Sequence, residues 1–242
     1  MNAVISLDEQ YYYINQILDN ILKRILLTPV TTPRETLYME TGLLDIETLI
    51  KMKRINMESR IKRGNNDLMK DIINIDHEKS WKRTTDAHKA KYGINSEDLD
   101  QSKSKTKTNV KTKIHSVFIQ EMKQASHEKS KVKHLIDGKQ SEFTDIQPDY
   151  MTKLSRMQVS QIFKARTRML DCKNNFRGKY NNLICRRCGI EDETQEHILE
   201  KCQAIHPDDN TRIKSGDIFV EDANELKVTA AKIKNIMETL QG

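Results

Sequence analysis

Apolar residues recur at intervals of three and four positions along most of this 242-residue chain, which is the spacing of amphipathic helices. The first such stretch covers residues 6–27, where Ser6 and Glu9 have the separation of a helix-capping box. The apolar residues that follow share one face: Ile14, Ile17, Leu18, Ile21, Leu22 and Ile25. The pattern predicts an amphipathic helix that ends near Pro29.

Two more helices are expected within the first sixty or so residues. Thr32 and Pro33 fit the N-cap and first position of a short helix that Gly42 ends. Asp45 is expected to cap a longer helix that ends at Gly64. The apolar positions of this longer helix lie near one stripe: Ile46, Leu49, Ile50, Met57 and Ile61. Together the three helices predict a small bundle.

The middle of the chain continues the helical pattern with one interruption. A helix from about Asp67 carries the only tryptophan, Trp81. Apolar content then falls, and residues 92–109 are expected to form a basic linker or exposed loop. Helical spacing resumes at Val110 and breaks again at Gly138.

Residues 149–171 predict one long helix with an apolar stripe and a separate basic ridge. The apolar stripe contains Leu154, Met157, Ile162, Ala165 and Met169. The basic ridge contains Lys153, Arg156, Lys164 and Arg168. Such a ridge can follow a phosphate backbone, although a merely solvated face has the same pattern.

The last twenty or so residues predict another helix, capped by Asp222 with Glu225. Its apolar residues form a heptad-like seam that either packs internally or pairs with a partner helix: Leu226, Ala230, Ile233, Met237 and Leu240. The best strand candidate is GDIFV, residues 216–220. The sequence therefore predicts a mainly α fold.

Three of the four cysteines and two of the seven histidines lie within residues 184–206. Cys185, Cys188, His197 and Cys202 have the spacing of a Cys-Cys-His-Cys knuckle, and four such donors can surround a tetrahedral zinc ion. Gly189 can take the positive φ that closes the first turn. We therefore expect zinc as a structural cofactor. Glu196 and Glu200 either accept the second N–H of His197 or simply face water.

Other interpretations of the cysteines are weaker. A disulfide is not needed in a chain of this length without a secretory signal, and a catalytic zinc requires an open coordination position. Coincidence is improbable for a closed ligand set in a chain with few cysteines. His206 has the spacing of a substitute ligand, and Cys172 is expected to be a buried apolar residue.

The net charge of +6 and the pI near 9 indicate a polyanionic partner where the charge is concentrated. Residues 101–113 carry five lysines and no acids, which fits either a polyanion or simple solubility. Residues 164–179 carry six bases and one acid. The candidate nucleic-acid contacts are Lys153, Arg156, Lys164, Arg166, Arg168, Lys173, Arg177, Lys179, Arg186 and Arg187.

No apolar run is long enough to cross a bilayer, and the N-terminus lacks the pattern of a secretory signal. The sequence therefore predicts a soluble intracellular protein of the nucleus or cytoplasm, without a membrane partner.

Two segments, taken in order, resemble a known family. Residues 26–55 contain Tyr-x-Glu-Thr-Gly-x-Leu-x-Ile, in the sequence LLTPVTTPRETLYMETGLLDIETLIKMKRI. Residues 160–180, SQIFKARTRMLDCKNNFRGKY, lead into the knuckle CRRCGIEDETQEHILEKC. This arrangement resembles the C-terminal region, beyond the polymerase core, of non-LTR retrotransposon reverse transcriptases, over about residues 14–240.

The resemblance implies a helical thumb and connector that grip an RNA template or target DNA, with a knuckle that helps to bind nucleic acid. The expected ranges are a thumb-like domain at 1–91, the linker at 92–109, a connector with the basic ridge at 110–180, the knuckle at 181–206 and a C-terminal helix at 207–242. No Tyr/Phe-x-Asp-Asp motif is present, so the carboxylates that polymerisation requires are missing.

Asp208, Glu225 and Lys227 imitate the residue order of a nuclease signature, but Glu225 and Lys227 lie in a predicted helix rather than on strands. We therefore expect no enzymatic activity. The leading hypothesis is a zinc-containing protein that binds RNA or DNA. The alternatives are an interaction module that docks on a separate polymerase-containing protein, and a fragment without a selected role.

Overall fold

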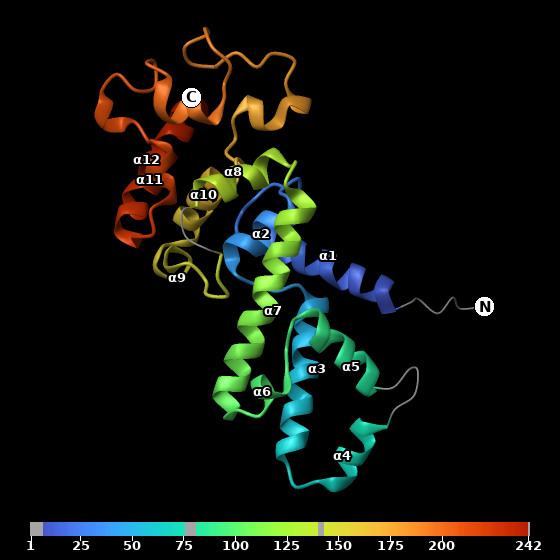
Figure 1. Cartoon of the computed structure of the whole chain (residues 1–242). Helices are drawn as coiled ribbons and strands as arrows, with labels where there is room; N and C mark the ends of the chain where they lie inside the picture. Colours follow the sequence, from blue (N-terminus) through green and yellow to red (C-terminus); the bar gives the residue numbers. More distant parts are fainter. Residues whose placement is uncertain (1–6, 76–80, 140–142, 242) are drawn as a thin grey trace, which may run out of the picture. The chain divides into compact units, whose positions relative to one another are not determined.

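The computed structural model describes residues 7–75, 81–139 and 143–241, so the predicted Ser6 cap lies outside the described part of the chain. Its elements are helices, as predicted (Figure 1). Within the described ranges the only β pairing is an isolated antiparallel bridge between Ile184 and Asp192. The strand predicted at residues 216–220 is wrong, because this segment lies mostly in helix α11 (Ser215–Phe219). No described helix combines the length and apolarity needed to span a bilayer.

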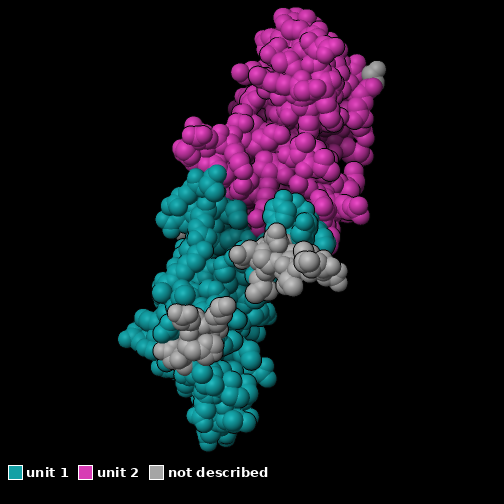
Figure 2. Space-filling model, turned by 90° about the vertical axis from the view of Figure 1, so that its right-hand side faces the viewer, with its two compact units in different colours: residues 1–18, 42–125, 143–145 teal, residues 19–41, 126–142, 146–242 magenta. Residues whose placement is uncertain are grey.

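The chain divides into two compact units (Figure 2). Unit 1 comprises residues 1–18, 42–125 and 143–145, and unit 2 comprises residues 19–41, 126–142 and 146–242. Each unit combines segments that are distant in sequence. This division differs from the consecutive domains that the sequence suggested.

Unit 1 is built mainly from the helices between residues 42 and 125. They are α3 (Ile46–Arg63), α4 (Asp67–Asn74), α5 (Trp81–Lys91), α6 (Ser96–Leu99) and most of α7 (Lys103–Ser126), and α1 (Leu7–Ile25) begins in this unit. Its apolar core consists of Ile55, Tyr92, Ile94, Leu99, Val110 and Ile114. Asp45 caps α3 as predicted, because its Oδ1 accepts a hydrogen bond of 2.8 Å from the backbone N–H of Thr48.

The predicted linker at 92–109 is wrong. Tyr92, Ile94 and Leu99 are buried in the core of unit 1, and α7 begins at Lys103. A capping box between Asn95 and Asp98 starts α6, with two hydrogen bonds of 3.0 Å. The segment has few apolar residues, but these few are the buried ones, so low apolar content did not indicate a linker here.

The predicted apolar stripes of the first helices are not the faces that become buried. On α3, Ile50 and Met57 are exposed, whereas Ile55 is completely buried. On α1, Leu22 is buried, but most of the predicted face is exposed: Ile14, Ile17, Ile21 and Ile25. Helical spacing predicted the elements correctly, but it did not identify the side that packs.

Unit 2 contains the remaining helices and the cysteine cluster. They are α2 (Arg34–Thr41), α8 (Ser130–Gly138), α9 (Asp149–Lys153), α10 (Arg156–Arg166), α11, α12 (Ala223–Gln241) and the short helices η1 (Lys173–Lys179), η2 (His197–Lys201) and η3 (Asp209–Thr211). Helix α12 packs against α9, α10, α11 and η2. Its predicted seam is buried from Leu226 to Leu240, so the seam packs internally rather than against a partner helix.

The single helix predicted for residues 149–171 is also wrong. Helix α9 ends before the extended Leu154, and Ser155 caps α10 through a capping box with Gln158. Helix α10 ends at Arg166, and Arg168 has a left-handed φ of 52°. Lys153 and Arg168 therefore lie outside α10, and the predicted basic ridge is not one continuous helix face.

Arg166 is buried in unit 2, where it bonds several groups, and it is not available to bind nucleic acid. Its side chain is 4% exposed, and Nη1 lies 2.5 Å from the Glu40 carboxylate. Nε and Nη2 each donate a 2.8 Å hydrogen bond, to the carbonyl oxygens of Ile218 and Val220. The Tyr150 hydroxyl donates to the same Glu40 oxygen at 2.8 Å. This ion pair joins the two segments on which the family resemblance rests, and we correct the prediction that Arg166 contacts nucleic acid.

Candidate metal centre

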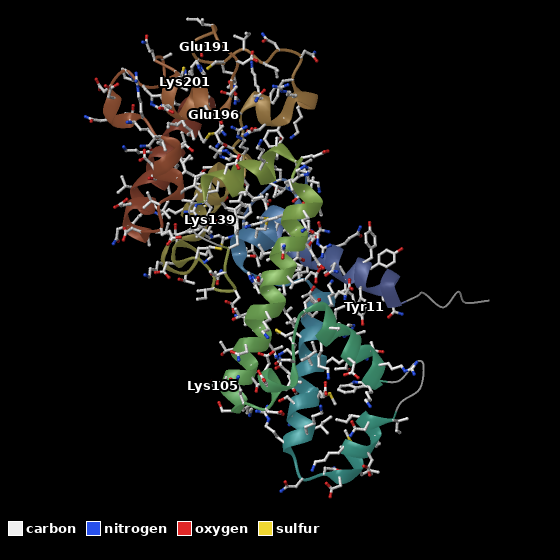
Figure 3. All side chains as sticks on the ribbon, viewed as in Figure 1. Tyr11, Lys105, Lys139, Glu191, Glu196 and Lys201 are labelled. Carbon is white, nitrogen blue, oxygen red and sulfur yellow. The ribbon has the colours of Figure 1, made fainter. Side chains whose placement is uncertain are left out.

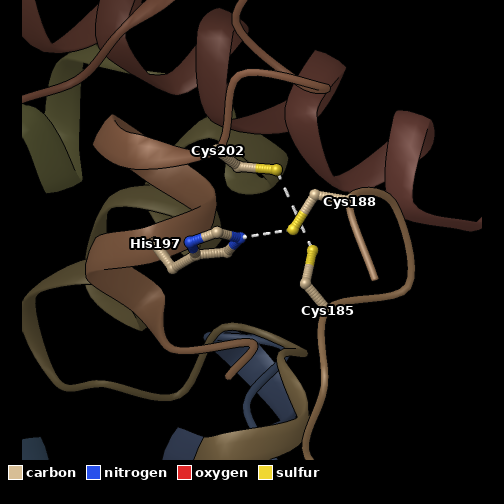
Figure 4. A group of neighbouring side chains, drawn as sticks. All are labelled: Cys185, Cys188, His197 and Cys202. Atoms are coloured by element: carbon tan, nitrogen blue, oxygen red, sulfur yellow. Dashed lines mark hydrogen bonds between the residues drawn. The ribbon is translucent and has the colours of Figure 1, made fainter. Parts of the chain in front are cut away.

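The four predicted metal ligands lie together in unit 2 (Figure 4). The donor atoms of Cys185, Cys188, His197 and Cys202 all lie within 4.8 Å of one another. The Sγ atoms of Cys185 and Cys202 are 3.9 Å apart, and Sγ of Cys188 is 3.3 Å from Nε2 of His197. Zn–S bonds of about 2.3 Å in a tetrahedron place two sulfurs roughly 3.8 Å apart. The spacing therefore fits one tetrahedrally bound metal ion.

The turn between Cys185 and Cys188 is closed by backbone hydrogen bonds. The N–H of Gly189 donates to the carbonyl of Cys185 at 3.0 Å, and Gly189 has the predicted positive φ, at 66°. The N–H of Cys185 donates to the carbonyl of Glu191 at 2.7 Å, so the chain folds back on itself. This geometry directs both thiols toward one centre, and the free φ of glycine allows it.

His197 and Cys202 are brought together by a π-helical turn, which the sequence did not reveal. Positions five residues apart are offset by about 140° on an α-helix, which turns about 100° per residue. In η2 the N–H of Cys202 instead donates to the carbonyl of His197 at 2.8 Å, an i to i+5 bond. The wider turn moves the two side chains toward the same side of the helix.

Glu191 orients the imidazole. Its Oε2 lies 3.1 Å from Nδ1 of His197, which leaves Nε2 facing the sulfurs. Neither Glu196 nor Glu200, the predicted partners, has this role, and Glu196 instead pairs with Arg168. Glu191 and Glu196 are labelled in Figure 3. No helical spacing links Glu191 to His197, because Glu191 reaches the ring through the fold-back after Gly189.

The thiols are electrostatically unequal. Backbone N–H groups of Glu191 and Ile190 lower the pKa of Cys188 to about 6. Burial raises the pKa of Cys202 to about 11. A metal ion bound by these ligands would therefore displace protons, among them the proton of the Cys202 thiol.

A second buried carboxylate secures the turn. Glu193 is completely buried and accepts hydrogen bonds from Arg186 at Nε, at 2.9 Å, and at Nη2, at 2.7 Å. The backbone N–H groups of Arg186 and Lys173 donate to it at 2.9 and 3.0 Å. Burial alone would raise the pKa of Glu193, but Arg186 and these N–H groups outweigh it and hold the pKa below its ordinary value. Arg186 thus holds the cysteine turn together, a structural role that the sequence did not predict.

The other predicted cysteine and histidine roles can now be compared with the structure. His206 is buried, with its ring nitrogens 3.0 Å from Oγ1 of Thr211 and 2.8 Å from the carbonyl of Ile198. It is not a substitute ligand. Cys172 is completely buried outside the cluster, as predicted, and burial raises the pKa of its thiol to about 12.

Most of the other predicted nucleic-acid contacts already bond within unit 2. Lys153 pairs with Asp149, and Arg168 with Glu196. Arg156 donates to the carbonyl oxygens of Arg24 and Ile25 at the end of α1. Lys173 donates to the carbonyl of Ile184 at 2.6 Å. Lys164 is half-buried, and this burial lowers its pKa.

Three of the predicted contacts are exposed and have no carboxylate partner among the described residues. They are Arg177, Lys179 and Arg187. The Lys179 ammonium lies 5.1 Å from the centre of the Phe176 ring, and Lys131 lies 5.5 Å from the same ring. Arg177, Lys179 and Arg187 flank the metal centre in sequence, on η1 and in the cysteine turn. That they contact nucleic acid remains a prediction.

The nuclease-like residues do not form a carboxylate site. Glu225 lies in the first turn of α12, where its N–H donates to Oδ1 of Asp222 at 2.9 Å. Asp222 therefore caps this helix as predicted, and Lys227 lies one residue beyond Leu226 on the same helix.

No protein-family model, curated protein or solved structure matches this chain. The chemistry of its own residues is therefore the basis for any function assigned to it.

Proposed function

We propose that this chain is a non-enzymatic protein that binds nucleic acid and uses a structural zinc ion to hold the end of unit 2 in shape. Three thiols and one imidazole favour zinc over magnesium or calcium, which prefer oxygen ligands. Four protein ligands complete a tetrahedron and leave no position for a substrate. The free thiols also suit a reducing compartment, so the proposal places the chain in the nucleus or cytoplasm.

The observation that carries the nucleic-acid part of the proposal is the group of exposed cations beside the metal ligands. Arg187 lies within the cysteine turn, and Arg177 and Lys179 lie on η1. Glu193 joins η1 to this turn, because it accepts hydrogen bonds from the backbone N–H groups of Lys173 and Arg186. Phosphate groups neutralise such cations and release counterions, which favours binding without sequence preference. The order of motifs resembling the C-terminal region of retrotransposon reverse transcriptases supports the same function.

The test is a salt titration of binding to a labelled RNA and to a DNA duplex. We expect the variant R177Q/K179Q/R187Q to bind more weakly and to flatten the plot of log affinity against log salt by about 2, since each lost phosphate contact contributes roughly 0.7–0.9. The control is K214Q/K227Q/K234Q, which removes the same charge elsewhere in unit 2. Equal slopes for the two variants would contradict the assignment.

A second function, docking on another protein such as a separate polymerase, is favoured by one observation. In the part of α1 that belongs to unit 1, four large side chains are exposed: Tyr12, Tyr13, Ile14 and Ile17. If they form a docking surface, the variant Y13K/I17K will lose a captured protein partner while its affinity for nucleic acid stays the same. Loss of both activities would point to misfolding instead.

A further inference from the structure

A cavity of about 820 Å³ in unit 1 is lined by two helices that supply cations from both sides. Helix α3 and the start of α7 contribute the side chains. The basic residues among them are Lys53, Arg60, Arg63, Lys103 and Lys107. None of the described residues that line the cavity is acidic.

The cations of α3 are separated from its acids by helix geometry. Lys53, Met57 and Arg60 recur at steps of four and three, so they share one face. Glu58 lies on a different side, where it is buried and bonds Lys62 at 2.6 Å and Lys89 at 2.9 Å. The acid is therefore neutralised away from the cavity, and it does not compensate the cations that line it.

The lysines of α7 divide in the same way. Lys111 pairs with Asp145 at 3.0 Å, and Lys113 pairs with Asp98 at 2.5 Å. Lys103 and Lys107, which line the cavity, form no ion pair with any described residue. Lys105 lies on the same first turns of the helix (Figure 3). Within the lysine-rich run of residues 101–113, Lys111 and Lys113 thus form ion pairs, whereas Lys103 and Lys107 line the cavity without one.

Arg63 links the two walls. Its Nε donates to the carbonyl of Ser59 at 3.1 Å, and its Nη1 donates to the carbonyl of Gln101 at 3.0 Å. These bonds tie the end of α3 to the segment that precedes α7. The spacing of the walls is therefore fixed by hydrogen bonds as well as by the apolar core.

Like charges gathered around one cavity repel each other, and an anion in the cavity relieves that repulsion. We propose that the cavity binds the phosphate backbone of a nucleic-acid strand, with Lys53 and Arg60 on one wall and Lys103 and Lys107 on the other. From residue 53 to residue 63 the helix rises about 15 Å, at 1.5 Å per residue. This length suits several consecutive phosphates better than one. Met57 and Asn56 lie between the cations and offer apolar and amide contacts to sugars or bases.

This inference rests on the proposed function and deepens it, because it adds a contact region in unit 1 to the cations of unit 2. The test uses the full zinc-loaded chain and a labelled single-stranded RNA of about 30 nucleotides, with fluorescence anisotropy measured at several salt concentrations. The variant is K53Q/R60Q/K107Q. The control is K91Q/K111Q/K113Q, which removes the same charge from the same unit at lysines that have carboxylate partners.

We expect the cavity variant to bind at least about tenfold more weakly near 0.1 M salt and to lose about 2 from the salt slope, with a change of less than about threefold for the control. The fluorescence of Trp81, the only tryptophan, reports whether unit 1 is folded in each variant. If the triple variant unfolds, the single variants R60Q and K107Q replace it, and each should lower the slope by about 0.7.

The outcomes separate the two proposals. If the wild-type chain binds the RNA and the cavity variants bind it with the same affinity and salt slope, this inference is overturned and the proposed function stays intact. Absence of wild-type binding would overturn both. Adenosine monophosphate is added as a competitor, and displacement of the RNA by this mononucleotide at matched phosphate concentration would show a site for small phosphates and would also overturn the inference.

Discussion

The buried ion pairs of unit 2 and the basic cavity of unit 1 use cationic side chains in different ways. In unit 2 two of the arginines predicted to contact nucleic acid are structural: Arg166 bonds Glu40 in the interior, and Arg186 bonds the buried Glu193. In unit 1 the cations around the α3 and α7 cavity have no carboxylate partners among the described residues. A basic residue in the sequence is therefore no guide to binding until its partners are known.

The difference follows from where each unit places its carboxylates. Unit 2 buries Glu40 and Glu193 completely, and a buried carboxylate needs a hydrogen-bonded cation. Unit 1 also buries Glu58, but its partners Lys62 and Lys89 lie away from the cavity. Pairing thus withdraws Arg166 and Arg186 from binding in unit 2, whereas the cations that line the cavity of unit 1 stay available.

The largest expected effect comes from loss of the metal. The variant Cys202→Ser should lose bound zinc and unfold the end of unit 2, because metal binding supplies on the order of 10 kcal/mol in isolated zinc-binding peptides. Metal analysis measures the zinc content, and the visible absorption of the cobalt-substituted protein reports on the site. Trp81 emission, which reports on unit 1, should change much less.

The matched control for this variant is Cys172→Ala, which alters the one cysteine outside the cluster. It should keep one equivalent of zinc. Two results would contradict this prediction. One is zinc retained by the Cys202→Ser variant, and the other is a change in Trp81 emission as large as the change in the cobalt absorption.

The next effect in size concerns the buried ion pair. Arg166→Met leaves the Glu40 carboxylate buried without its cation, which should lower the free energy of unfolding of unit 2 by about 3–5 kcal/mol. The double variant with Glu40→Gln should recover part of this loss. Urea unfolding followed by circular dichroism measures both. The RNA affinity of the folded fraction should stay unchanged. If the Arg166→Met protein folds but no longer binds RNA, Arg166 contacts nucleic acid after all, as the sequence predicted.

A smaller effect is expected at the break between α9 and α10. Ser155→Ala removes the capping hydroxyl and should cost about 1 kcal/mol in the free energy of unfolding. Ser104→Ala, at an exposed position of α7 in unit 1, should change it by less than about 0.5 kcal/mol. Urea titrations of the two variants measure both changes in the free energy of unfolding. Equal changes would mean that the Ser155 cap does not stabilise the start of α10.

The smallest effect is the pH dependence of unit 1. Burial lowers the pKa of His115 below its ordinary value near 6.5, with Asp145 and Lys111 the charged groups that act on it, and burial also lowers the pKa of His88. As the pH falls through the ordinary histidine pKa near 6.5, these histidines bind more protons in the unfolded chain than in the folded chain. The stability of unit 1 should therefore fall as the pH drops from 7 to about 5.5. Urea titrations followed by Trp81 emission measure this change. His115→Gln should flatten the dependence, and His127→Gln, at an exposed position, should not.

Sequence reasoning succeeded where the relevant signal is local. The metal ligands, the Asp45 and Asp222 caps and the positive φ of Gly189 all depend on spacing within a few residues. It failed where a tertiary partner decides. No local pattern indicates that Arg166 meets Glu40, which lies 126 residues away.

The same limit explains the misassigned linker and the missed ligand orientation. Tyr92, Ile94 and Leu99 are isolated apolar residues in a polar stretch, and only the folded unit shows that they complete a core. Glu191 reaches His197 through a fold-back, and the π turn of η2 brings His197 and Cys202 to the same side of the helix. The pattern predicted which residues ligate the metal, but not how the chain places them.

The most direct test of the central claim is the affinity of the zinc-loaded full chain for single-stranded RNA and for duplex DNA as a function of salt concentration. The account predicts binding that weakens steeply with salt, with a slope of about −3 or steeper, because several phosphates are neutralised. Absence of binding at low salt, or an affinity that does not change with salt, would contradict it.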